Sequence, residues 1–230
     1  FVPDLADWAH VNAVIHDSTD NTIIISARLQ GVMKLTYDNK VKWILAPHYG
    51  WRKNRRGEEL APYLLKPIDA AGNPITDTQV LNGLADRADF EWPWFQHSPA
   101  LTPDHNLLVF DNGTTRNNNP DLPKYSRAVE YKIDETNMTI QQVWAYGKER
   151  GLETFSGIVS SVQYLPEKNH VLFAPGWQVA NTVGKGGKIV EIDRATKTVV
   201  AQTSVSSPNL WGFHRTKRVK IYANGNPYTE

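Results

Sequence analysis

The chain repeats one unit of four short amphipathic strands joined by tight turns, which restricts it to folds built from small stacked sheets. The first copy covers residues 7–45, the second 95–145 and the third 157–203, while 211–223 resembles the opening strand of a further copy. Without the long inserts the period is about forty residues, as in propeller blades, and each blade needs neighbours to bury its faces. The sequence therefore predicts an all-β fold, a β-propeller, over residues 1–230.

Three blades and a fragment do not close a ring, because propellers typically carry about four to eight blades around a central channel. The chain also begins at Phe1 without an initiating methionine. We interpret it as the carboxy-terminal part of one larger propeller domain, with the remaining blades in an amino-terminal part that is lost or on another chain. A small four-bladed ring is the alternative.

The insert at residues 50–91 is much longer than an ordinary connection within a propeller. Long ordered loops are commonly functional. We therefore expect this insert to cover one mouth of the central channel.

The composition argues against several classes of function. The chain has no cysteine, which rules out disulfides and thiol chemistry, and a net charge of +1, which argues against a nucleic-acid partner. No transmembrane run is present, so we expect no membrane partner. Its eight tryptophans and many turn-forming residues suit a periplasmic or secreted β protein.

Two histidines occupy the same register in two copies of the repeat. His10 and His97 each stand seven residues before a turn aspartate, so we expect them to take the same structural position in successive blades. Asn12 shares the strand face of His10, and Arg28 follows the adjoining strand. These groups, converging on the channel, would bind an anion and exchange a proton near neutral pH. The alternative for each histidine is an ordinary hydrogen-bonded or surface role.

A metal site is not supported by the spacing of the remaining candidates. No compact zinc signature occurs, there are no thiolates, and Asp17 and Asp104 fall at turns. The other histidines with no assigned role are expected to lie at the surface or in turns: His16, His48, His105 and His170. We therefore expect no metal.

Several ordered motifs run through almost the whole chain. They are Asp7-Trp8-Ala9-His10-Val11-Asn12, Val41-Lys42-Trp43-Ile44-Leu45, Leu65-Lys66-Pro67, Gln96-His97, Phe110-Asp111-Asn112-Gly113, the run from Tyr125 to Asp134, and the run from Gln141 to Gly151. With these motifs the chain resembles the bacterial arylsulfate sulfotransferases, which do not depend on the usual nucleotide sulfate donor. The resemblance implies a six-bladed propeller preceded by a small amino-terminal β domain, of which this chain is the carboxy-terminal half.

The resemblance also implies a reaction. The family moves a sulfuryl group from a phenolic sulfate ester to a phenol acceptor through a covalent sulfohistidine, which implies ping-pong kinetics and no metal or organic cofactor. His97 matches the nucleophile, and His10, Asn12 and Arg28 match its supporting residues. Family members take further active-site side chains from the missing half, so we expect this chain alone to be inactive. Its partners would be small molecules and the missing blades, and a homo-oligomer is left open.

The aromatic residues before His97 are candidates for substrate binding. Trp92, Trp94 and Phe95 would form a wall for the aryl ring, or else ordinary blade core. Two other functions stay open at this point. One is a propeller that binds a ligand or protein without chemistry, and the other is a sulfate ester hydrolase in which water replaces the phenol.

Overall fold

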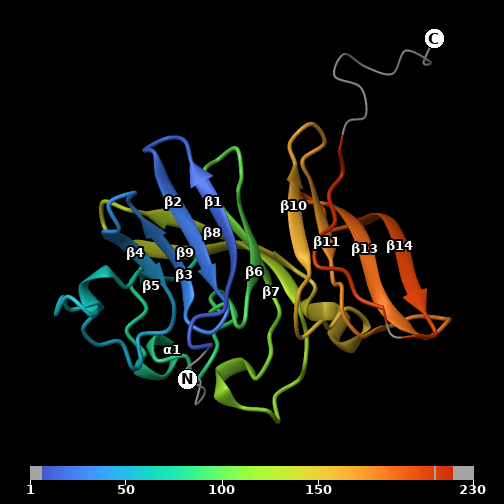
Figure 1. The fold of residues 1–230 in the computed structure, drawn as a ribbon, viewed down its shortest axis with the longest axis horizontal. Helices are drawn as coiled ribbons and strands as arrows, with labels where there is room; N and C mark the ends of the chain where they lie inside the picture. The colour runs from blue at the N-terminus through green and yellow to red at the C-terminus, as the bar shows by residue number, and fades with distance from the viewer. Residues whose placement is uncertain (1–6, 210, 220–230) are drawn as a thin grey trace.

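The computed structural model describes residues 7–209 and 211–219, which form three antiparallel sheets standing side by side (Figure 1). The first sheet, blade 1, pairs its strands in chain order: β1 (Val11–Asp17), β2 (Thr22–Ala27), β3 (Gly31–Leu35) and β4 (Val41–Leu45). Four consecutive strands joined by short turns form the meander of a propeller blade. The all-β propeller architecture is thereby confirmed.

The second and third sheets repeat this arrangement. Blade 2 consists of β6 (His97–Leu101), β7 (Leu107–Asp111), β8 (Arg127–Asp134) and β9 (Thr139–Tyr146). Blade 3 consists of β10 (Ser161–Leu165), β11 (His170–Ala174), β13 (Lys185–Asp193) and β14 (Val199–Ser207), with the two-residue strand β12 (Val179–Ala180) paired to β13. The first strand of blade 2, β6, contacts the first strands of both neighbours. Among the described residues, no helix has the length and apolar character needed to span a membrane.

Strand β7 shows why the blades stack. All five of its residues are buried, and because side chains alternate across a strand, they face two different cores. Leu107 and Val109 pack with blade 1, whereas Leu108 and Phe110 pack with blade 3. A run of apolar residues on both faces of a strand is typical of a strand that is covered on both faces. The sequence of β7 therefore requires a neighbouring blade on each side.

The insert at residues 50–91 lies elsewhere than expected. It contains the short helices η1 (Ala61–Tyr63) and α1 (Thr78–Leu81), and β5 (Lys66–Ile68), which pairs in parallel with β9, the fourth strand of blade 2. Leu64 also bridges to Ile44 of β4. The insert therefore joins the outer strands of blades 1 and 2, and the expectation that it covers the channel mouth is wrong. Its apolar side chains explain this position, because they complete the core between these blades.

The opening strand expected over 211–223 does not form across 211–219, and the rest of that range lies outside the described residues. The segment instead runs beside β10, where Ser161 accepts from the backbone N–H of Thr216 and Gln163 accepts from that of Arg218. Side chains of β10 thus accept the hydrogen bonds that the backbone of a neighbouring strand would otherwise accept.

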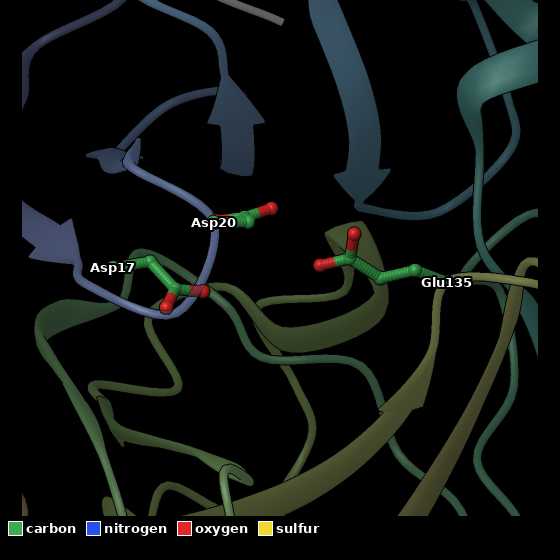
Figure 2. Close-up of side chains that lie close together, drawn as sticks. All are labelled: Asp17, Asp20 and Glu135. Carbon is green, nitrogen blue, oxygen red and sulfur yellow. The ribbon is translucent and has the colours of Figure 1, made fainter.

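An ionic cluster around the buried Lys34 and Asp17 also joins blades 1 and 2. Three carboxylates face one another, those of Asp17, Asp20 and Glu135 (Figure 2). The ammonium group of Lys34 lies between them, 2.7 Å from Asp17, 3.0 Å from Asp20 and 2.5 Å from Glu135, and Lys42 contacts the latter two. The lysines supply the positive charge that such a cluster needs, so the geometry indicates an ion network rather than a metal centre.

Replacement of Lys34 should destabilise the fold. Lys34 is only 2% exposed, and Lys34→Met would remove the ammonium group that pairs with the buried carboxylate of Asp17 and leave that carboxylate beside His105, 3.1 Å away. We expect the free energy of unfolding to fall by about 3 kcal/mol in a denaturant titration. The control is Lys40→Met, because Lys40 forms a fully exposed pair with Asp38 and should leave the stability almost unchanged. Equal effects of the two substitutions would contradict this account.

Candidate functional site

The candidate site lies where the first strands of the blades begin. His97 is the first residue of β6 and is 2% exposed. The backbone on either side of it is strained, since Phe95 and Ser98 have φ angles of 56° and 53°, in the left-handed region that non-glycine residues avoid. Such outliers persist only where surrounding structure imposes them, and they cluster at functional sites.

Two acceptors determine which ring nitrogen of His97 carries the proton. Nδ1 lies 2.7 Å from Asn112 Oδ1 and 3.1 Å from the carbonyl oxygen of Phe95. The Asn112 amide can point only one way, because its Nδ2 donates to the carbonyl oxygens of Ser156 and Val159. Nδ1 must therefore be the donor, which leaves the lone pair on Nε2. Among the described residues, no hydrogen bond engages Nε2.

The surroundings of His97 keep its ring neutral. Burial, the nearby His214 and the Arg28 guanidinium lower the pKa of His97 to about 4. The hydrogen bonds of His97 to Asn112 and Phe95 raise this pKa, but they do not outweigh the other causes. Desolvation and neighbouring positive charge both disfavour an imidazolium. At neutral pH the ring is therefore neutral.

Arg28 supplies the positive charge of the site. It follows β2, and its guanidinium stacks on the ring of Phe95 with 4.9 Å between the guanidinium carbon and the ring centroid. Nη2 donates to the carbonyl oxygen of Gly157 at 3.4 Å, while the buried Nε–H has no partner among the described residues. Burial lowers the pKa of Arg28, and Asp7 opposes this, but an arginine stays protonated. The unpaired Nε–H of Arg28 could donate a hydrogen bond to an anion.

Asn12 positions the backbone next to His97. Its Nδ2 donates to the carbonyl oxygen of Gln96 at 2.8 Å, and Ser26 donates to the same oxygen at 3.3 Å. Gln96 in turn donates to the carbonyl oxygen of Ala27. Blade 1 thus holds both the backbone and the side chain of Gln96, the residue before His97. The Asn12 amide has one further N–H proton that could be donated to a ligand.

His10 has different surroundings from His97, although each stands where the first strand of its blade begins. The His10 side chain is 43% exposed, and its Nδ1 lies 2.5 Å from Asp7 Oδ2. Its carbonyl oxygen accepts from the backbone N–H of Arg28, which links it to the site. The carboxylate orients the ring, as an acid–base histidine requires.

The aromatic wall expected from Trp92, Trp94 and Phe95 is present only in part. Trp92 is wholly buried against Phe90 and donates its indole N–H to Val80, so it belongs to the core between blades 1 and 2 and cannot touch a ligand. Trp94 also packs on this core. Phe95 lies under Arg28.

Sequence reasoning missed two residues of the site. Asn112 stands in the quoted Phe110-Asp111-Asn112-Gly113 motif, and its proximity to His97 arises only when β6 and β7 pair. The ring of His214 lies 5.6 Å from that of His97, centroid to centroid, in an edge-to-face arrangement. The sequence did offer a signal for His214, because this residue stands in the segment 211–223 that resembles the opening strand of a further copy.

The fold and the site together define a propeller protein whose blades present a neutral histidine, with an unprotonated Nε2, beside an arginine. Comparison with known proteins is more specific. The family model described as Arylsulfotransferase (ASST) matches residues 2–214. The chain therefore belongs to the arylsulfotransferase family.

Individual relatives agree with this assignment. Arylsulfate sulfotransferase AssT of Escherichia coli O6:H1 (strain CFT073) is 46% identical over 206 residues, which cover 87% of this chain and 33% of that protein. AssT of Lelliottia amnigena matches to the same extent. The chain thus spans about a third of the length of these curated relatives. Among solved structures, the Dos1 propeller matches with a TM-score of 0.35 and 10% identity, covering 84% of this chain and 46% of that one.

The His97 ring should titrate well below the ordinary range of histidine. We expect an imidazole NMR titration to give a pKa of about 4, with Nδ1 protonated and Nε2 bare at pH 7. A midpoint near 6.5, or a proton on Nε2 at pH 7, would contradict the assigned geometry.

The same shift affects stability. The unfolded chain protonates His97 near pH 6.5, whereas the folded chain does so only near pH 4, so this group makes stability fall as the pH drops between these values. His97→Gln should flatten that part of the stability curve measured by denaturant unfolding at successive pH values. An unchanged curve would show that His97 is not held neutral.

Proposed function

We propose that the parent protein, meaning the whole polypeptide that contains these 230 residues, is an arylsulfate sulfotransferase with His97 as its nucleophile. The observation that carries the proposal is the bond from His97 Nδ1–H to the fixed Asn112 amide, which leaves a bare Nε2 beside Arg28. Membership of the arylsulfotransferase family supports the substrate class. AssT is described as an arylsulfate sulfotransferase in both relatives.

In the first half of the proposed reaction, His97 Nε2 attacks the sulfur of an aryl sulfate. A bond forms between Nε2 and sulfur as the bond between sulfur and the aryl oxygen breaks, and the electron pair leaves on the phenolate oxygen. Arg28 donates to the peripheral sulfuryl oxygens, where fixed donors stabilise charge without reorganisation. His10, oriented by Asp7, supplies a proton to the departing phenolate.

In the second half, a phenol acceptor attacks the sulfur of the sulfohistidine. The nitrogen–sulfur bond breaks, its electron pair returns to Nε2, and the phenolic proton passes to the base left by the first half. Donor and acceptor therefore use one site in turn, which gives ping-pong kinetics. The groups named so far belong to this chain, so the proposed chemistry calls for no metal or organic cofactor.

Blades beyond these three are also part of the proposal. The inner strands β1, β6 and β10 follow one another, with β6 in contact with the other two, whereas a propeller channel is enclosed by a full ring of about four to eight blades. We therefore propose that transfer needs the parent protein and that the 230-residue chain alone is inactive.

The covalent intermediate can be tested by mass. Brief exposure of the parent protein to 4-nitrophenyl sulfate should add one sulfuryl group on His97, as seen by intact-mass and peptide analysis, and His97→Ala should abolish the adduct. Turnover without an adduct would contradict a stable sulfohistidine. Consumption of the ester that does not accelerate with added phenol would identify a hydrolase, and a parent protein that binds the ester without turnover would be a binding propeller.

The role of His10 predicts a dependence on the leaving group. Phenolate needs a proton far more than the less basic 4-nitrophenolate, so His10→Gln should slow transfer from phenyl sulfate by about a hundredfold and transfer from 4-nitrophenyl sulfate much less. Steady-state rates with both donors measure this. The matched control is His16→Gln, an exposed histidine on β1 bonded to Asn21, which should affect neither. Equal losses with both donors would assign His10 a purely positional role.

A further inference from the structure

A cavity of about 370 Å³ opens beside Arg28. It lies between the loop after β7, which includes the short helix η2 (Arg116–Asn118), and the loop that precedes β10. Its apolar lining consists of Leu122, Phe155, Ile158 and Trp177. The volume falls within the range of small-molecule sites, about 300–1,000 Å³, and two aromatic side chains suit an aryl ring.

The charges around this cavity have one sign. Among the described residues its lining includes Arg28, Arg116 and Lys124 but no aspartate or glutamate. Arg116 is balanced by Asp111 at 2.9 Å, whereas Arg28 and Lys124 have no carboxylate in contact in the described part of the chain. The buried Nε–H groups of both arginines also lack a partner there. The cavity thus combines apolar walls with two cations that contact no carboxylate among the described residues, Asp7 acting on Arg28 only at longer range, and this suits an aromatic anion.

The cavity shares parts with the site around His97. Gly157 lines the cavity, and its carbonyl oxygen accepts from Arg28 at 3.4 Å and from Thr114 at 2.7 Å. The residue before it, Ser156, accepts from Asn112, which holds His97. The Arg28 guanidinium lies over Phe95 and also lines the cavity. A sulfuryl group held by Arg28 would therefore leave its aryl ring in this cavity.

Lys124 is the group that the transfer reaction does not use. It is exposed at the cavity and bonds to none of the described residues. We propose that the cavity is the aryl subsite and that Lys124 selects aromatic substrates carrying a second anionic substituent, such as a carboxylate, besides the hydroxyl or sulfate that reacts. This inference rests on the proposed function, since that function assigns Arg28 to the sulfuryl group.

Two ligands of nearly the same shape test the role of Lys124. Calorimetric titration of the parent protein, without a sulfate donor, should show that 4-hydroxybenzoate binds more tightly than the neutral 4-hydroxybenzamide at low ionic strength. Lys124→Met should weaken the benzoate about threefold to fivefold and leave the benzamide unchanged, because an exposed charge pair contributes up to about 1 kcal/mol. The control Lys132→Met, at an exposed lysine of β8, should change neither affinity.

A second pair of variants tests the cavity itself. Leu122→Trp should fill it and weaken both ligands more than tenfold, whereas Leu152→Trp, at a 70% exposed leucine outside the cavity lining, should not. Equal affinity for the two ligands, or full binding by Leu122→Trp, would overturn the proposal. These titrations involve no transfer, so binding as expected in a protein that forms no sulfohistidine would reject the proposed function and keep the cavity as an aromatic-anion site.

Discussion

The candidate site depends on one hydrogen bond, the 2.7 Å contact between His97 Nδ1 and Asn112 Oδ1. It fixes the tautomer only because the Asn112 amide is itself fixed by two carbonyl oxygens, those of Ser156 and Val159. Val159 has a φ of 50°, which is costly for a β-branched residue. The loop before β10 therefore bears backbone strain in the place where it orients the proposed nucleophile, as expected when function opposes local stability.

Packing of blade on blade brings these segments together. His97 lies in blade 2, Arg28 follows the second strand of blade 1, and Ser156 belongs to the loop that leads into blade 3. Their separation is set by the two cores on either side of β7 and by the ion network around Lys34. Since interiors are close-packed, a change in either core would move Arg28 or Asn112 relative to His97. The packing that stabilises the blade interfaces therefore also fixes the geometry of the site.

Strand-level features could be predicted from the sequence, because they depend on a period of two residues and on turn chemistry. This holds for the all-β class and for the approach of Arg28 to His10 across the β1–β2 pair. The position of the insert could not be predicted, since only the assembled blades reveal the gap that its apolar residues fill. Trp92 illustrates the same limit, because an aromatic residue close to a site in sequence can face either a ligand or the core. Asn112 was missed because it meets His97 only through strand pairing.

The burial of His97 has a consequence for substrate binding. Burial of the ring, together with the nearby His214 and Arg28, disfavours a further positive charge and so lowers the pKa of His97. The proposed substrate, a sulfate monoester, would bring negative charge to the same place, where a desolvated environment strengthens its attraction to Arg28. The bound anion would then favour protonation of His97, by linkage, and so work against the nucleophile. A pKa as low as about 4 in the free protein leaves room for that upward shift while the ring stays neutral near pH 7. The deep burial of the ring thus allows one site to hold both an anion and an unprotonated nucleophile.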